Sequence, residues 1–371
     1  MRLITTPFVQ TCLPPPRPGV AATGSTLKIP EQGAAVPLEP PVALAAPRNT
    51  LHRPVTTRER ADMSAWNADQ IPDQTGRRVV VTGANSGLGE ITARELARKG
   101  AHVVLAVRSA DKGEAAAQRI RSTASGAQLE VRELDLSSLE SVRTFAAGLI
   151  ADSATLHLLI NNAGIMQTPA RRTAEGYELQ LGTNHLGHFA LTGLLLEALG
   201  RGTGPRVVTV SSTEHKPGRI HFDDLQLERD YTPRRAYQQS KLANAIFAIE
   251  LDRRLRAAGS PILSVLAHPG YSATNLQSSG PTGIAALGMR IGNALLAQKA
   301  DQGALPQLLA ATAPTVRSGQ FYGPSGFQEM RGDPTEVHAT PEAHDPATGR
   351  RLWALSEELT HVIYPLQGPT A

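Results

Sequence analysis

The chain has 371 residues, of which 41% are hydrophobic and 19% are charged, and its one cysteine is Cys12. This composition is typical of a globular protein with a sizeable core, and it excludes a disulfide framework or a thiolate metal site. Of the formal net charge of +4, +3 lies in residues 1–62, which contain seven Lys/Arg and four Asp/Glu. The nearly neutral remainder argues against a nucleic-acid partner. The sequence contains no run of 18 apolar residues, so it predicts no membrane span.

The first 70 residues differ from the rest of the chain. Residues 1–62 hold 11 of the 27 prolines and show no sustained helical or strand periodicity. Such a segment cannot bury enough apolar surface to offset its ordering entropy. Three interpretations stay open: a translated upstream region with the working start at Met63, a disordered extension, or a targeting leader. A secretory signal fits poorly, because polar residues and a proline interrupt the stretch from Leu3 to Leu13.

From Arg77 onward, short apolar segments alternate with segments of helical periodicity. The expected strands are residues 77–82, 102–107, 128–133, 156–161, 207–211 and 262–267, with a seventh near Phe321. The expected helices are residues 87–99, 110–123, 138–151 (behind a Ser137–Glu140 capping box), about 174–199 and 233–258. Buried strands separated by helices form a parallel sheet covered on both faces, with right-handed crossovers. The sequence therefore predicts an α/β fold with one doubly wound, Rossmann-type sheet of about seven strands over residues 75–366.

The turns after the first two strands point to a nucleotide. In T-G-A-N-S-G-L-G (82–89), a helix begins among glycines, so bare N–H groups and the positive end of the helix dipole favour a phosphate. An ordinary glycine-rich turn is the alternative. After the second strand, apolar Val107 and basic Arg108 stand where an acidic residue would hold the ribose hydroxyls of NAD. The sequence thus favours NADP, unless Arg108 is only a surface residue.

Proton-transfer chemistry is indicated by Tyr237 and Lys241, which lie four positions apart on one face of a predicted helix. A nearby ammonium favours the ionised form of a phenol. Such a pair can move a proton to or from a substrate oxygen while hydride passes to or from carbon. Because Tyr-x-x-x-Lys is common by chance, its value comes from its position after the fifth strand and the serines Ser211 and Ser212.

Taken together, these motifs resemble the short-chain dehydrogenase/reductase family, specifically its retinol-dehydrogenase-like and protochlorophyllide-reductase-like branch. The resemblance runs from Arg77 to about Tyr322. Its motifs are T-G-A-N-S-G-L-G at 82–89, A-V-R-S with Arg108, D-L-S at Asp135, N-N-A-G at Asn161, T-N-H-L-G-H-F-A-L-T at 183–192, V-S-S at Val210, Y-Q-Q-S-K-L-A-N at 237–244 and H-P-G at His268. The long spacing from Ser212 to Tyr237 carries H-F-D-D-L (221–225), which this branch shares.

The resemblance implies an NADP(H)-dependent oxidoreductase for a lipophilic alcohol/carbonyl pair, with NAD as the alternative cofactor. Tyr237 would be the acid/base, Lys241 would lower its pKa and hold the nicotinamide ribose, and Ser212 would bind the substrate oxygen. Asn184 would hold a water that links Lys241 to solvent. The implied cofactor contacts are Gly83, Asn85, Ser86, Gly87, Leu88 and Gly89 at the pyrophosphate side, Arg108, Asp135 and Leu136 at the adenosine side, Asn161, Ala163 and Gly164 at the ribose, and Pro269, Gly270 and Thr274 at the nicotinamide.

Further expectations follow from the same resemblance. A substrate lid is expected at about 275–299, although the apolar stretch 283–297 could instead contact a membrane. Location in the cytoplasm is expected, and a homodimer through the helices that begin near Pro233 and Asp301 stays open. We expect His185 and His188 to be packing residues and expect no metal. A catalytically silent cofactor-sensing or scaffold protein is the alternative function, but such proteins usually lose the tyrosine or the lysine.

Overall fold

The computed structural model describes residues 66–152, 155–271 and 300–366. Clustering of contacts places every described residue in one compact unit. Three predictions lie outside the described residues: the leader with its start at Met63, the lid, and the role of Thr274.

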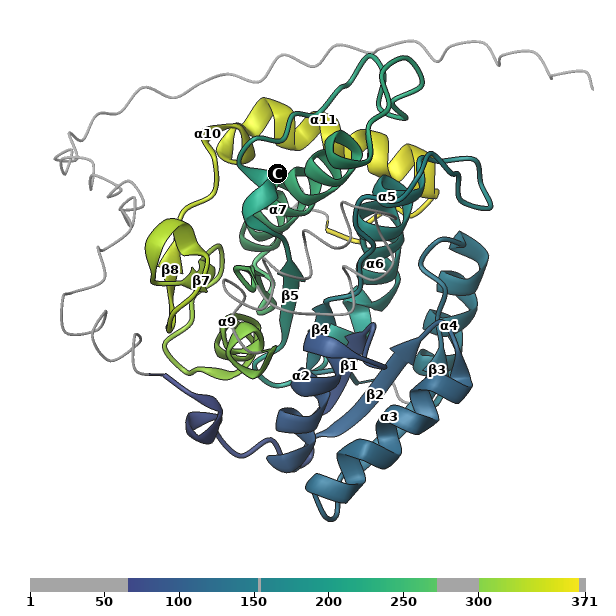
Figure 1. Cartoon of the computed structure of the whole chain (residues 1–371). Coiled ribbons are helices and arrows are strands. Elements are labelled where there is room, and N and C mark those ends of the chain that lie inside the picture. The colour runs from purple at the N-terminus through teal and green to yellow at the C-terminus, as the bar shows by residue number, and fades with distance from the viewer. Residues whose placement is uncertain (1–65, 153–154, 272–299, 367–371) are drawn as a thin grey trace, which may run out of the picture. The chain divides into compact units, whose positions relative to one another are not determined.

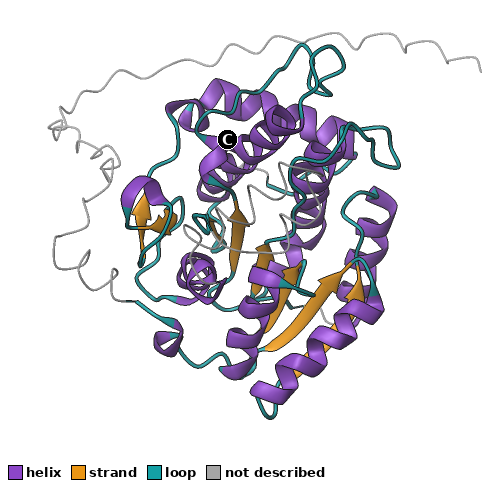
Figure 2. Cartoon of the chain, viewed as in Figure 1, coloured by secondary structure: helices purple, strands orange, loops and turns teal. Residues whose placement is uncertain are grey.

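Eight strands form one sheet in the order β3-β2-β1-β4-β5-β6-β7-β8. Strands are orange in Figure 2. The strands are β1 (Arg78–Thr82), β2 (His102–Val107), β3 (Gln128–Glu133), β4 (Leu158–Asn161), β5 (Arg206–Val210), β6 (Leu263–Ala267), β7 (Phe321–Pro324) and β8 (Pro334–Val337). The first seven pair in parallel, which confirms the predicted doubly wound sheet. The eighth, antiparallel to β7, was not predicted, because a four-residue segment that begins with proline reads as a loop.

Helices cover both faces of the sheet (Figure 1). The longer helices are α2 (Gly87–Arg98), α3 (Ala110–Thr123), α4 (Leu139–Asp152), α6 (Gly187–Gly200), α7 (Pro233–Ala257), α9 (Ala300–Thr312) and α11 (Pro346–Thr360), and the short ones include α5 (Leu179–Leu181) and α10 (Pro341–His344). The chain reverses its winding between β1 and β4, which are neighbours in the sheet. In such sheets, ligands bind beyond the carboxyl ends of the strands at this point.

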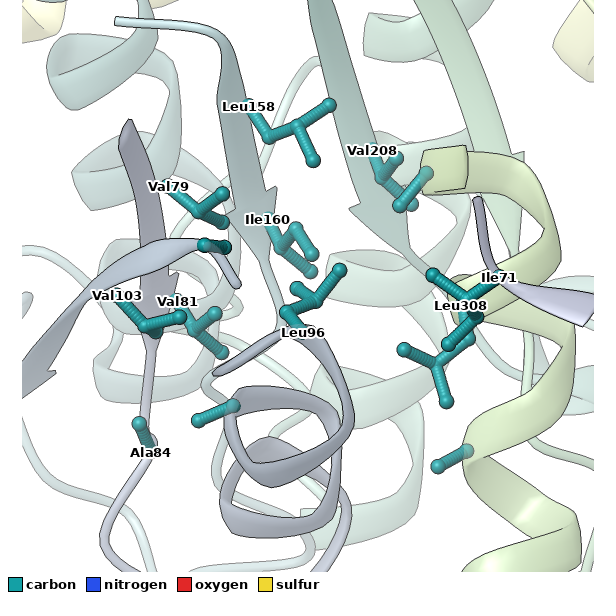
Figure 3. Packing of buried hydrophobic residues seen from close by; sticks show 14 of the residues in the cluster. Ile71, Val79, Val81, Ala84, Leu96, Val103, Leu158, Ile160, Val208 and Leu308 are labelled. Carbon is teal, nitrogen blue, oxygen red and sulfur yellow. The ribbon is translucent and has the colours of Figure 1, made fainter. Parts of the chain in front are cut away.

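The strands bury alternate side chains on opposite faces, which is why they read as continuous apolar runs. Val79 and Val81 of β1 pack with Leu96 of α2 and Leu308 of α9 in one cluster (Figure 3). Val80, between them, belongs to a second cluster with residues of α4, α6, α7 and α11. Both faces of β1 are therefore fixed, and the turn that follows it is held in place.

Two predicted helix starts differ from the structure. The segment expected as one helix from 174 is a turn closed by Thr173, whose N–H donates to the carbonyl of Tyr177 at 2.8 Å, followed by α5, a π-helical segment (Gly182–Leu186) and α6. The predicted capping box at α4 is also wrong. Ser138 Oγ accepts from the N–H of Ser141 at 3.3 Å, whereas the Ser137 hydroxyl donates to Asp135 at 2.6 Å.

The two helices expected at a homodimer contact are largely buried within the chain. Helix α7 is buried from Ala236 to Asp252 except for the half-buried Gln238 and Ile249, and α9 is exposed mainly in its first turn. Trp353 of α11 packs near α7, where the guanidinium of Arg254 lies 4.3 Å from its ring centre. Within the described ranges 66–152, 155–271 and 300–366, each helix is too short or too polar to span a bilayer.

Candidate active site

The polar motifs meet around one cavity of about 1170 Å³ at the carboxyl edge of the sheet. Most of the predicted site residues line it: Gly83, Asn85, Ser86, Gly87, Leu88, Gly89, Arg108, Asp135, Leu136, Ala163, Gly164, Ser212, Tyr237, Lys241, Pro269 and Gly270. Asn161 and Asn184 are absent from this lining among the described residues. The cavity lies where the strand order of a doubly wound sheet places its ligand.

The glycine turn forms a tight cradle at the start of α2. Gly83 and Gly87 have φ values of 69° and 57°, which favour glycine. A methyl group on Gly89 would clash with the carbonyl of Gly83 and lie 2.6 Å from Nδ2 of Asn162. Within the described chain, the Ser86 hydroxyl makes no capping hydrogen bond to α2. The first N–H groups of α2 are therefore available to an anion, and this cradle fits a pyrophosphate.

The two asparagines of the N-N-A-G segment make different contacts. The Asn161 side chain points into the protein, where Nδ2 donates to Thr192 Oγ1 at 2.9 Å. Asn162 lines the cavity and donates to the carbonyl of Thr82 at 2.8 Å. Asn161 was the predicted cofactor contact, whereas Asn162, which lines the cavity, was not predicted. The missed signal is the burial pattern, because a strand-end residue whose side chain faces the helices cannot also face the ligand edge.

Two cations flank the cavity at the end of β2. Arg108 and Lys112 both line it, and neither has an ion-pair partner among the described residues. Arg119 also lines it, but its guanidinium is paired with both Glu90 oxygens at 2.8 Å. Lys112 was not predicted. A lysine in the first turn of α3 is unfavourable because it lies near the positive end of the helix dipole, and this signal in the sequence could have identified it as a candidate binding residue.

Tyr237 and Ser212 are brought together by the docking of α7 on β5. The side chains of Thr232 and Pro233 start the helix: Thr232 Oγ1 accepts from the N–H of Arg235 at 3.2 Å, and proline occupies the first turn. The Ser211 hydroxyl then donates to the carbonyl of Lys241 at 2.8 Å. The next residue, Ser212, lies close enough to the Tyr237 hydroxyl to lower its pKa.

Lys241 lies behind the tyrosine ring. Its Nζ is 5.8 Å from the ring centre of Tyr237 and donates to the carbonyl of Val210 at 3.2 Å. Burial lowers the pKa of Lys241 to about 8. Burial also raises the pKa of Tyr237 to about 12, against the lowering effect of the neighbouring Ser212 side chain. This direction is opposite to the one expected from the lysine, because desolvation of the phenolate dominates.

Asn184 is a buried brace in the π-helical segment. Its Oδ1 accepts from the N–H of Ile165 at 2.8 Å, and its Nδ2 donates to the Ile165 carbonyl at 3.0 Å and to Ser240 Oγ at 2.9 Å. A methyl group on Gly164 would lie 3.3 Å from Asn184 Oδ1 and 3.5 Å from Lys241 Nζ. Asn184 therefore adjoins Lys241 across Gly164, and any relay role for it stays a prediction.

The two histidines that follow Asn184 are buried packing residues. His188 Nδ1 lies 2.9 Å from the carbonyl of Asn184, and its Nε2 lies 2.9 Å from Thr82 Oγ1. His185 Nε2 lies 2.9 Å from Ser356 Oγ. Burial lowers their pKa values to about 3 for His185 and about 4 for His188. Both are neutral at physiological pH and join the π-helical segment to β1 and α11.

Comparison with known proteins places this geometry in a family. The sequence model for short chain dehydrogenases matches residues 77–283. Retinol dehydrogenase 12 of Homo sapiens is 42% identical over 292 residues, which cover 78% of this chain and 87% of that protein. The chain belongs to the short-chain dehydrogenase family. Retinol dehydrogenase 11 of Homo sapiens is 52% identical over 201 residues, 54% of this chain and 62% of that protein.

A solved structure supports the same assignment. An uncharacterised protein from Mycobacterium paratuberculosis superimposes with a TM-score of 0.68 at 48% identity, covering 81% of this chain and 99% of that one. As a short-chain dehydrogenase, the chain is an NAD(P)-dependent oxidoreductase that acts on CH–OH groups. The glycine cradle and Tyr237 line the same cavity.

Four further predicted site residues of this short-chain dehydrogenase line the cavity: Asp135, Leu136, Pro269 and Gly270. Asp135 lines the cavity, although its Oδ1 also accepts from the N–H of Ser137 at 2.9 Å, as in a local turn. Leu136 lines the cavity from the same turn. At the opposite side, Pro269 and Gly270 line it from the loop after β6. Gly270 has a φ of 63° and packs against the segment around Met330.

Proposed function

We propose that this chain interconverts a lipophilic alcohol and its carbonyl compound with NADP(H), with Tyr237 as the proton donor and acceptor. The observation that carries the proposal is the placement of Tyr237, Ser212 and Lys241 on the cavity that also contains the glycine cradle. When bound, the nicotinamide ring supplies or accepts the hydride.

The protonation states favour a role for Tyr237 as a general acid. With its pKa near 12, the phenol is protonated at neutral pH and can donate to a carbonyl oxygen. The Ser212 hydroxyl, which lines the same cavity, would bind that oxygen. Lys241 is buried, and its ammonium would stabilise the phenolate left after proton transfer. In the reverse direction, the same phenolate would accept the alcohol proton.

Preference for NADP(H) is supported by Arg108 and Lys112. An anion at the end of β2 would meet two cations with no ion-pair partner among the described residues. The ribose diol of NAD would instead need an acceptor such as a carboxylate. We therefore propose that these two side chains bind the 2′-phosphate.

A lipophilic substrate is supported by the apolar side chains Ile165, Met166 and Leu179 in the cavity lining. Relatives that carry the name retinol dehydrogenase point to the same class of alcohol. Aldehydes of increasing chain length test this point. We expect kcat/KM to rise with each added methylene, since about 0.8 kcal/mol accompanies burial of a methylene group.

The mechanism is tested by following NADPH absorbance with a panel of lipophilic aldehydes and ketones. Tyr237→Phe is expected to lower kcat for the best substrate by about 10²–10⁴-fold with NADPH affinity unchanged. Full turnover by this variant would refute the role of Tyr237. Tight NADPH binding with no turnover of any compound by the wild type would favour the silent scaffold.

A further inference from the structure

A cluster of three charged or titratable side chains lies beside the active site without lining it. His268, in the H-P-G motif, is buried, and its Nε2 lies 3.0 Å from Oε2 of Glu329. Lys216 Nζ donates to Oε1 of the same carboxylate at 2.7 Å. Gly323 permits this arrangement, because any Cβ at that position would clash with the imidazole of His268.

The hydrogen bonds assign the tautomer of His268. The N–H of Gly270 donates to Nδ1 at 3.1 Å, so Nδ1 is an acceptor. The imidazole proton is then on Nε2 and is donated to Glu329. Burial lowers the pKa of His268, in agreement with a neutral ring. Glu329 thus holds the ring in the one tautomer that can accept from Gly270.

The segment that carries Glu329 has an uncommon backbone. Gln328 and Glu329 have φ values of 51° and 56°, both in the left-handed region that favours glycine. The next residue, Met330, accepts from the N–H of Tyr271 at 2.8 Å. Strained non-glycine residues persist where the surroundings hold them, often at functional sites. Here the holding contacts reach two loops of the active site.

The second loop is the serine turn, residues 212–216, which follows β5. Lys216 ends this turn, and His215 Nδ1 donates to the carbonyl of Ser212 at 2.6 Å. The rings of His215 and His268 both pack edge-on against Phe321 of β7, with ring centres 5.5 and 5.2 Å apart from it. One carboxylate therefore joins the loop of Pro269 and Gly270 to the turn of Ser212.

We propose that Glu329 is a positioning residue that fixes the H-P-G loop relative to the serine turn. The inference rests on the proposed function in one respect, namely that the loop contacts the nicotinamide and the turn contacts the substrate oxygen. Hydride transfer needs the nicotinamide and the substrate to be aligned, and a misplacement of 1 Å can lower the rate by about 10²-fold. Glu329 acts on that distance without touching either group.

The test compares Glu329→Gln with Glu197→Gln, which alters an exposed ion pair with Arg201 on α6. Hydrogen exchange of residues 266–271 is measured in the full chain without cofactor, and it is expected to be faster in Glu329→Gln only. With the best aldehyde, kcat is expected to fall by about 10²-fold. Affinity for adenosine 2′,5′-bisphosphate, which lacks the nicotinamide half, is expected to stay unchanged.

Each outcome decides the proposal. Unchanged hydrogen exchange or an unchanged kcat in Glu329→Gln would overturn the proposal. A loss of affinity for adenosine 2′,5′-bisphosphate as large as the loss of kcat would also overturn it, because it would show general destabilisation instead. If the wild type has no turnover, the proposed function fails, while the exchange measurement still decides whether Glu329 braces the loop. If Glu329→Gln does not fold, Lys216→Met replaces it in the test, because this variant removes one contact of Glu329. Hydrogen exchange and kcat are then expected to change in the same directions by smaller amounts.

Discussion

The side chain of Ser212 lies close enough to the hydroxyl of Tyr237 to lower its pKa, although one residue lies in helix α7 and the other in the turn after β5. Both groups line the cavity. A carbonyl oxygen between them would meet a proton donor and a second hydroxyl.

The reductive activity should depend on the charge of Lys241. Because burial lowers its pKa to about 8 from the ordinary 10.5, the ammonium is lost as the pH rises through 8. We expect kcat/KM for carbonyl reduction to fall above this pH, while Tyr237 stays protonated up to about pH 12. A rate profile measured up to pH 10 checks this. A profile that stays flat throughout that range would contradict it.

Arg108→Ala and Lys112→Ala should each reduce the preference for NADPH over NADH. A hydrogen bond to a charged group contributes about 1.5–3 kcal/mol, so each substitution should reduce the preference by roughly 10–100-fold. The measurement is the ratio of dissociation constants for the two cofactors. Arg121→Ala, an exposed arginine on the same helix α3, is the matched control and should leave the ratio unchanged. Retained preference in both cavity variants would show that other groups bind the phosphate.

Gly89→Ala should destabilise the glycine cradle. The added methyl group would clash with the carbonyl of Gly83 and crowd Asn162. Overpacking of this kind costs about 1–3 kcal/mol, and NADPH binding should weaken with it. Urea unfolding and a binding titration measure the two effects. Gly200→Ala, where a methyl group meets no atom within 4 Å, is the control and should be neutral or stabilising.

Trp353→Ala should lower the free energy of unfolding by about 3–5 kcal/mol. The Trp353 ring centre lies 5.1 Å from that of Phe189 and 4.5 Å from that of Tyr364, so its removal leaves a large cavity. Ile363→Ala, at a side chain that is 73% exposed in the same C-terminal segment, should change stability by less than about 0.5 kcal/mol. If Trp353→Ala lowered the free energy of unfolding as little as Ile363→Ala, α11 would add little to the stability of the core.

Prediction from sequence succeeded where a local pattern is enough. The valines of β1 are apolar on both faces, which identifies a buried parallel strand, and the glycines after it identify the turn. It failed at two helix starts, where alternative local hydrogen bonds compete. The start of α4 is capped by Ser138 rather than by the predicted box, and the turn around Thr173 interrupts a sequence that reads as one helix.

The sequence alone determined the family, the order of the seven parallel strands along the chain and which loops reach the carboxyl edge of the sheet. These follow from periodicity and from motif order along the chain. Only the tertiary structure decided that Asn162 rather than Asn161 lines the cavity, that Lys112 lines it as Arg108 does, and that burial raises the pKa of Tyr237. The physical reason is that side-chain direction and desolvation depend on what packs around a residue, and those neighbours come from distant parts of the chain.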